Sequence, residues 1–385
     1  MASKQRERAM FERMMDDKTL SRRDLLRGLV TWGGATLLAA CGQPAAPPTS
    51  NGETGDVAAA PEAPAATGAG GNVVVATWGG DYQRLLGENI EQPILAPQSI
   101  VVTHDIGDVP TRKTKLRVEK DASVGSLDVI HFGDTDMYEM YQAGVLLDLD
   151  QTKILNWVNI NPQFVNAYSI PHIYSAQVIL YNTEQIPAPP DSYAIFWDAQ
   201  YKGKVGILDT NWTQWLQIAS QLSGGGPTDY EPGKTKLMEL KALEPQIFAS
   251  QEKLAEALQS GDVWMTPNWR ARGVMWQKAG MPISMAVPQE GAAPVLFRAG
   301  IAKNAPNPDL AYTYLNAMLD PGAQIGFGDQ MGYIPTVTNA LMMPEDAARM
   351  GFTDEEQANF VESDFDYIAT NNAAWQEWWL KNFLS

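Results

Sequence analysis

Short apolar runs alternate along the chain with stretches in which apolar residues recur at helical spacing. The runs at 73–75, 127–132, 176–181, 205–209 and 263–265 predict buried strands. Helices are predicted from about Tyr82, from 134 to Gly144, around 254–258 up to Gly261, and from Pro308 to Asp320. No internal repeat is visible. This alternation predicts an α/β fold with largely parallel sheets.

The stretch from Val73 to Tyr82 reads as a strand, a glycine turn and a helix. Two glycines after Trp78 permit a sharp turn and a close approach of the backbone to a ligand, and Asp81 is a candidate helix cap. Trp78 and Tyr82 then follow the carboxyl end of a strand, where open α/β sheets bind ligands. Taken alone, the stretch slightly favours a core aromatic beside an ordinary turn.

The N-terminal region has the pattern of an export signal. A twin-arginine arrangement at 21–26 precedes an apolar run at 28–40, which is too short to span a bilayer because a spanning helix needs about 20 residues. The run ends at Leu38-Ala39-Ala40-Cys41, which resembles a bacterial lipobox. Cys41 is the only cysteine, so no disulfide within the chain is possible. We expect residues 1–41 to be a twin-arginine lipoprotein signal with Cys41 lipidated; a plain cleaved signal is the alternative.

Residues 42–71 are rich in Ala, Pro, Gly and Thr, which predicts a flexible linker. The remaining chain is long enough for two lobes. The formal net charge is −17, and the first 40 residues carry eight basic and five acidic side chains, so the rest is near −20. This balance argues against nucleic acid and against an anionic membrane surface as partners.

Motifs of the common enzyme classes were not found. The chain lacks G-x-S-x-G, H-E-x-x-H and C-x-x-C, and Gly233-Lys234-Thr235 has no first glycine at the position a phosphate loop requires. The three histidines are scattered without metal-ligand spacing. The sequence therefore predicts no catalytic residue, cofactor or metal, although paired carboxylates remain open because acidic residues are frequent.

Several segments resemble, in the same order, the solute-binding proteins of ABC importers, in the branch typified by the spermidine/putrescine-binding proteins. They are TWGGDY, LDVIHFGDTDMYEMYQAGVLLDLD, YSIPHIYSAQVILYN, FWDAQYKGKVGILD, ALQSGDVWM, NWRARGVMWQKAGMPI, VPQEG, NPDLAYTYLNAML and MGYIPT. The resemblance implies a two-lobed periplasmic-binding-protein fold of type II with the ligand cleft between the lobes. It also implies a monomer that performs no chemistry, closes on a small-molecule solute and docks on a membrane permease.

On this resemblance, we expect lobe one to comprise residues 72–174 and 296–336, and lobe two residues 175–295 and 337–385. The matched positions imply ligand contacts from aromatic residues and from the turns that follow strands. These positions are Trp78, Gly79, Tyr82, Gly133, Asp134, Thr135, Trp269 and Tyr333.

The chain departs from the polyamine binders where those proteins carry acids. Asn211 and Gln214 stand in for acidic residues, and Arg298 lies near the position of an amine-binding aspartate. An arginine there suits a carboxylate, unless Arg298 faces solvent. Arg270 and Arg272 have the same two alternatives: each either binds a carboxylate or faces solvent. Asp134 or Asp136 is still available to bind an amine. The site therefore predicts a small polar solute of polyamine, amino-acid or carboxylate type.

Trp375, Trp378 and Trp379 lie at helical spacing, which predicts packing rather than ligand contact. Two other functions remain open at this point. One is a secreted, lipid-anchored hydrolase that uses carboxylates, which turnover of a substrate without a transporter would favour. The other is a structural lipoprotein, which the absence of any stabilising small molecule would favour.

Overall fold

A computed structural model describes residues 70–385 of the 385-residue chain. The predicted signal, Cys41 and almost all of the predicted linker lie outside the described residues. The first strand, β1, begins at Gly71, the last residue of the predicted linker. In the part of the chain that the structure describes, no helix is long and apolar enough to cross a membrane.

The main sheet has six strands in the order β10-β4-β9-β3-β1-β2, and two further strands, β7 and β8, pair with β4. A separate pair, β5 and β6, lies beside it. The strands are β1 Gly71–Thr77, β2 Ile100–Ile106, β3 Val129–Gly133, β4 Ile170–Asn182, β5 Gly206–Leu208, β6 Gln246–Phe248, β7 Met265–Trp269, β8 Ile283–Ala286, β9 Pro294–Ile301 and β10 Ile334–Pro335.

The prediction of largely parallel sheets is wrong for the main sheet. β1 is parallel to β2 and β3, but β9 is antiparallel to β3 and β4, and β4 is antiparallel to β7, β8 and β10. The five predicted strands overlap β1, β3, β4, β5 and β7, whereas β2, β6, β8, β9 and β10 were not predicted. The direction of the main sheet depends on β9. This late strand inserts between β3 and β4 and runs against both.

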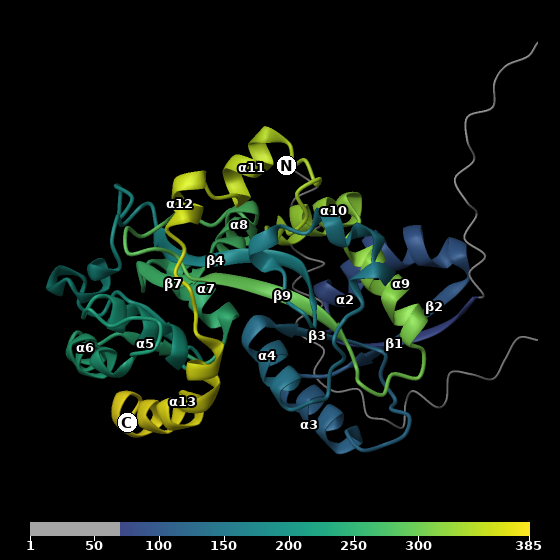
Figure 1. The fold of residues 1–385 in the computed structure, drawn as a ribbon. Helices are drawn as coiled ribbons and strands as arrows, with labels where there is room; N and C mark the ends of the chain where they lie inside the picture. The colour runs from purple at the N-terminus through teal and green to yellow at the C-terminus, as the bar shows by residue number, and fades with distance from the viewer. Residues whose placement is uncertain (1–69) are drawn as a thin grey trace, which may run out of the picture. The chain divides into compact units, whose positions relative to one another are not determined.

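Helices cover both faces of the β1–β2–β3–β9 region, with α9 and α10 on one side and α3 and α4 on the other (Figure 1). The helices are α2 Asp81–Leu86, α3 Val109–Glu119, α4 Asp134–Gln142, α5 Trp212–Gln221, α6 Glu231–Ala242, α7 Gln251–Ser260, α8 Arg270–Lys278, α9 Pro308–Met318, α10 Pro321–Met331, α11 Pro344–Met350, α12 Asp354–Ala358 and α13 Phe365–Trp378. Gly87–Leu95 and Trp379–Phe383 are π-helical, and 3₁₀ turns form at Ala96–Gln98, Gln151–Lys153, Leu155–Asn159, Pro162–Phe164, Tyr193–Trp197 and Ala199–Tyr201.

Helix boundaries agree with the sequence better than the predicted caps do. α7 ends at Gly261, whose φ of 77° is the left-handed conformation that favours glycine. Asp81, however, lies in the first turn of α2 and pairs with Arg84, and Gly80 occupies the cap position with a φ of 66°. Asn307 precedes α9 without a capping bond, because its amide contacts Asp128 instead.

Strand β4 links the hydrophobic clusters of the described residues. All of its residues are buried, and they contribute to three of the four clusters. Its pairing with β9 ends at Ala176, and its pairing with β7 begins at Gln177. The predicted packing role of the C-terminal tryptophans is confirmed, since Trp375 and Trp379 are 1% and 0% exposed and Trp378 packs against the same cluster.

Candidate functional site

Two cavities lie on either side of the first residues of β9. The smaller, the Trp269 cavity, has a volume of about 170 Å³. The larger, the Arg298 cavity, has a volume of about 430 Å³. Both are lined by Asp134, Pro294, Ser363 and Phe365. The Trp269 cavity adds Gly133, Thr135, Asp136, Gln177, Thr213, Gln214, Gln217, Trp269, Ala293, Val295 and Ile368, and the Arg298 cavity adds Gln163, Phe164, Leu296, Arg298, Gln357, Ala358, Phe360, Val361 and Glu362.

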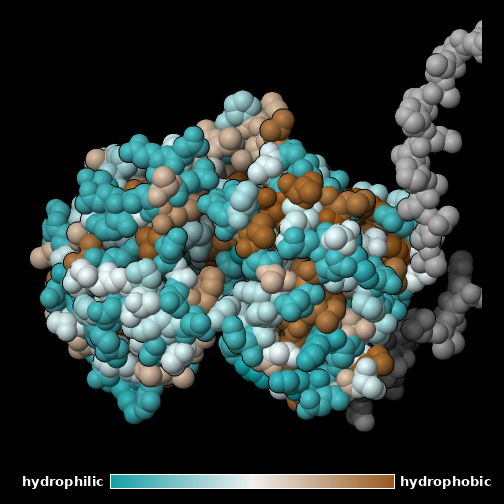
Figure 2. Space-filling model, in the orientation of Figure 1, coloured by the Kyte–Doolittle hydropathy of each residue, from teal (hydrophilic) through white to brown (hydrophobic). Residues whose placement is uncertain are grey.

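The Trp269 cavity is built where strands meet helices. β3 ends at Gly133 and α4 begins at Asp134; β7 ends at Trp269 and α8 follows directly. Thr213 and Gln214 lie in the first turn of α5, shortly after β5. Figure 2 shows a hollow in this face of the molecule between α4 and α13, two helices that contribute to the lining. Amide, hydroxyl and carboxylate groups therefore converge beside one indole ring, which suits a small polar ligand.

Of the predicted site residues, the structure brings Gly133, Asp134, Thr135, Gln214 and Trp269 together around the Trp269 cavity. Asn211 occupies the position before α5 and lies outside both linings. Arg270 begins α8 and donates to the carbonyls of Ala348 and Arg349, with its guanidinium over the ring of Phe352. These contacts hold the side chain of Arg270 against α11 rather than in the Trp269 cavity. Successive residues of a helix point about 100° apart, so Arg270 does not point the same way as the preceding Trp269.

Arg298 lines the Arg298 cavity and is only 6% exposed. The alternative that it faces solvent is therefore wrong. Its Nε forms an ion pair with Asp134, and its Nη1 donates to the carbonyl of Phe164 at 2.8 Å. Burial raises the pKa of the Asp134 carboxyl, and the charge of Arg298 acts in the opposite direction. The sequence analysis proposed the charge of Arg298 as a partner for a carboxylate of the solute. In the structure, Asp134 already neutralises that charge.

The four predicted aromatic contacts gather around one residue that the sequence analysis did not select, Phe297. The centroid of its ring lies 5.2 Å from that of Trp78, 5.9 Å from Tyr82, 6.2 Å from Trp269 and 5.3 Å from Tyr333. Tyr82 and Tyr333 are 5% and 4% exposed.

The Tyr82 hydroxyl shares a hydrogen bond of 2.9 Å with Nδ1 of His172. These buried positions place Tyr82 and Tyr333 behind Phe297, while Trp78, Trp269 and Phe297 itself are partly exposed.

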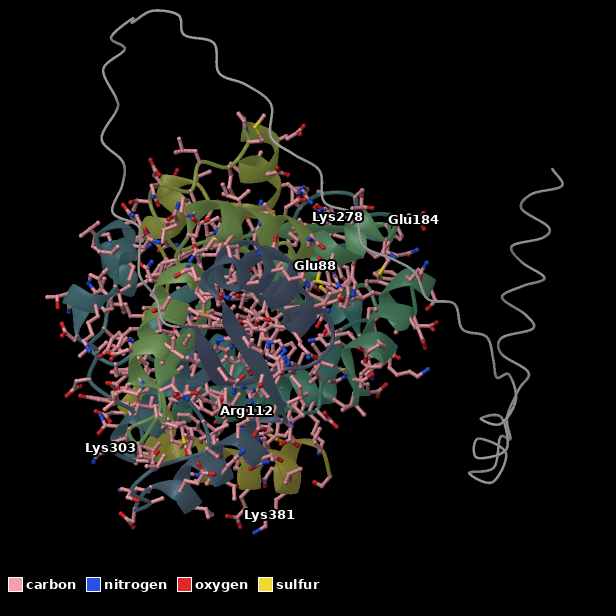
Figure 3. The ribbon with its side chains drawn as sticks, turned by 90° about the vertical axis from the view of Figure 1, so that its right-hand side faces the viewer. Glu88, Arg112, Glu184, Lys278, Lys303 and Lys381 are labelled. Carbon is pink, nitrogen blue, oxygen red and sulfur yellow. The ribbon has the colours of Figure 1, made fainter. Side chains whose placement is uncertain are left out.

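Arg112 supports Trp78 from inside the body. Its guanidinium carbon lies 4.4 Å from the centre of the Trp78 ring and 4.9 Å from that of Phe132, and its Nη1 donates to the carbonyl of His131. Burial lowers the pKa of Arg112 to about 10. Figure 3 labels this residue among the first strands, whereas Lys303 and Lys381 lie at the periphery. Sequence reasoning did not select Arg112, because it stands within the lysine- and arginine-rich helix α3.

Gly79 and Gly80 form a turn whose backbone needs glycine, but neither residue contacts the Trp269 or Arg298 cavity. A side chain at Gly79 would meet Ile106 at 3.1 Å, and Gly80 has a positive φ. Neither glycine lines the Trp269 or Arg298 cavity. The turn therefore positions Trp78 against Arg112 and Phe297.

The connection between α12 and α13 is a third feature that sequence reasoning missed. It crosses β7 and β9 in Figure 1 and supplies Ser363 to both cavities, and Phe365, the first residue of α13, lines both as well. It is held by a backbone hydrogen bond from Val361 to Ala292. Nothing in its composition marks it as part of a site, because its position depends on the docking of α13 into the core.

Comparison with known proteins shows where this architecture recurs. The family of bacterial extracellular solute-binding proteins matches residues 98–351. The spermidine/putrescine-binding periplasmic protein of Escherichia coli (strain K12) is 28% identical over 249 residues, which cover 61% of this chain and 70% of that protein.

Two solved structures share the fold, each with a TM-score of 0.71. An ABC transporter substrate-binding protein from Bradyrhizobium japonicum USDA 110 is 21% identical and covers 82% of this chain and 99% of its own. The Atu4243-GABA receptor is 22% identical and covers 80% and 97%. The predicted periplasmic-binding-protein fold is therefore confirmed. With a family match over most of the described residues, the chain belongs to the bacterial extracellular solute-binding proteins and is a binding protein rather than an enzyme.

Proposed function

We propose that the chain captures a small polar organic solute outside the cytoplasm and delivers it to the membrane permease of an ABC importer. The observation that carries this function is the Trp269 cavity. Polar groups from the starts of α4 and α5 face one partly exposed indole there. Such an arrangement orients a ligand by a few hydrogen bonds beside an aromatic surface.

Within this function, we propose a solute with at least one carboxylate, such as an amino acid, rather than a bare polyamine. The two acids that line the Trp269 cavity already have cationic partners: Asp134 pairs with Arg298, and Asp136 pairs with Lys113 at 2.9 Å. An ammonium group buried without an unpaired acid is costly. Gln177, Gln214 and Gln217 instead offer amides, which donate to carboxylates and accept from amines equally well.

The relatives support a solute from this range. The Escherichia coli relative is a spermidine/putrescine-binding protein, and one of the solved structures is a GABA receptor. The first solute class has only amines, whereas GABA carries an amine and a carboxylate. The pairing of the cavity acids favours the second class for this chain.

The two lobes that we propose are residues 72–174 with 296–336, and residues 175–295 with 337–385. Two hydrophobic clusters draw mainly on the first set, and two draw mainly on the second. The change of β4 partners between Ala176 and Gln177 lies close to the proposed boundary. The solute would then bind where the sets meet, beside the start of β9.

We further propose that a twin-arginine signal exports the protein, that Cys41 anchors it to the membrane as a lipoprotein, that residues 42–71 tether the body, and that it acts as a monomer. The sequence motifs support this arrangement. Cys41→Ser should move the protein from the membrane fraction to the soluble fraction. Unchanged membrane retention of that variant would rule out the lipid anchor.

The solute is best sought directly. Mass spectrometry of native protein purified without refolding should detect a co-purifying amino acid or other carboxylate. Calorimetric titration should then give a tighter dissociation constant for that compound than for putrescine or spermidine. Tighter binding of putrescine or spermidine than of any carboxylate by the native protein would overturn the proposed solute class, and binding of no small molecule at all would overturn the transport function.

A further inference from the structure

The residues at the start of β9 point alternately to two sides, as in any strand. Val295 lines the Trp269 cavity, whereas Leu296 and Arg298 line the Arg298 cavity. Phe297 therefore shares a face with Val295 and lies one step further along it. It is placed directly beyond the wall that β9 gives to the Trp269 cavity.

The backbone leaves room for a large ring at this place. In the register of β3 and β9, Phe297 is opposite Gly133, which has no side chain and itself lines the Trp269 cavity. The Phe297 ring meets Trp78 and Trp269 edge to face, at interplanar angles of 75° and 86°. Phe297 is partly exposed rather than buried. Its ring thus lies at the boundary between the cavity and the aromatic residues behind it.

We propose that Phe297 is the specificity-determining residue that limits the size of the solute. Its ring occupies the space enclosed by Trp78, Tyr82, Trp269 and Tyr333, and so closes the Trp269 cavity at that end. The solute class that follows is compact and polar, without a bulky apolar tail. This inference rests on the proposed binding function, but it does not depend on the charge of the solute.

The physical reason is that packed aromatic rings leave no space for a further ring. A solute with an apolar tail would have to displace Phe297 from its contacts with four neighbours. Removal of the ring should leave a space of benzyl shape, walled by aromatic side chains. An apolar tail that enters this space regains the burial that the phenyl group had provided.

The test is Phe297→Ala titrated with pairs of probes that differ only by a phenyl group. Ethylamine and phenethylamine carry a cation, glycine and phenylalanine are zwitterions, and propionate and 3-phenylpropionate carry an anion. Calorimetry should show that Phe297→Ala binds the phenyl member of at least one pair about tenfold or more tighter than the wild type does. The short member of that pair should show no such gain.

Two control variants distinguish this effect from a general loss of packing in the protein. Phe297→Leu keeps most of the apolar volume and should show no gain. Phe248→Ala removes a partly buried phenyl group on β6, away from both cavities, and should also show no gain.

The proposal is overturned if folded Phe297→Ala gains no affinity for any phenyl-bearing probe, or if Phe248→Ala gains the same affinity. It is also overturned if the wild type already binds the phenyl-bearing probe as tightly as Phe297→Ala does. These readouts compare variants on the same probes. They are therefore distinct from a failure of the transport function, in which the native protein carries no solute.

Discussion

Arg298 and Asp134 form an ion pair in which the side chains are only 7% and 13% exposed. Arg298 comes from β9 and Asp134 from the first residue of α4, so the pair fixes the start of that helix against the strand. Removal of charges from water is costly, and the mutual attraction of the pair offsets that cost only while both partners are present. Asp134 lines both cavities that flank β9, and Arg298 lines the larger of the two.

Arg298→Met should therefore lower the free energy of unfolding by about 3–5 kcal/mol, because it leaves the Asp134 charge buried without a partner. The double variant Asp134→Asn with Arg298→Met should recover much of this loss. Urea unfolding of the two single variants and the double variant measures the coupling. Strictly additive losses would mean that the two charges do not depend on one another.

Trp269 and Trp379 provide a matched pair of tryptophans. Trp269→Ala should weaken solute binding about tenfold or more with little loss of stability, because its ring is partly exposed and lines the cavity. Trp379→Ala should lower the free energy of unfolding by about 3–5 kcal/mol and leave the affinity of the folded protein unchanged, because that ring is 0% exposed. The reverse assignment of the two effects would move the site away from the Trp269 cavity.

Tyr82→Phe tests whether a predicted contact acts through the core. The substitution keeps the ring beside Phe297 but removes the hydroxyl that bonds to His172, so the buried Nδ1 of His172 loses its hydrogen-bond partner. We expect stability to fall by about 1–3 kcal/mol. The dissociation constant for the solute should not change. Weaker binding at unchanged stability would instead show that the hydroxyl contacts the solute.

His172 should make the protein sensitive to acid. Burial lowers the pKa of His172 from 6.5 to about 3. Between these values the unfolded chain takes up a proton that the folded protein excludes, so stability falls as the pH drops below 6.5. At pH 5 the loss amounts to about 2 kcal/mol.

His172→Asn keeps a polar side chain that can bond to Tyr82 but cannot take up this proton. The difference in unfolding free energy between pH 7.5 and pH 5, measured by chemical denaturation, should shrink by about 2 kcal/mol in that variant. An identical pH profile for wild type and variant would assign the acid sensitivity to other groups, such as the equally buried His131.

Local patterns predicted five of the ten strands of the described residues, and they predicted the junctions at which β1 and β3 lead into helices. The apolar run before Gly133 became β3, and the residues that follow it do line a cavity. A short-range signal suffices there because a strand end, a turn and a helix start are adjacent in the chain. Sheet direction was not predictable in the same way, since it depends on where β9 inserts among strands that are distant in sequence.

The predicted site was incomplete for the same reason. Phe297 was not selected, because its role depends on four rings that come from the turn after β1, from α2, from β7 and from the residue before β10. Ser363 and Phe365 reach the cavities only because α13 docks on the core. Arg270 was equally plausible as a contact until the turn of α8 directed it to α11.

The order of strands around β4 has a consequence for the newly made chain. Every partner of β4 is encoded after it, and the earliest of these, β7, begins only at Met265. While the ribosome completes the intervening residues, the thirteen residues of β4, all of them buried in the folded body, have no strand to pair with. Unpaired strands of this kind favour aggregation. The body can close its sheet only when synthesis is nearly finished, so we expect the nascent chain to depend on chaperones until β9 and β10 have emerged.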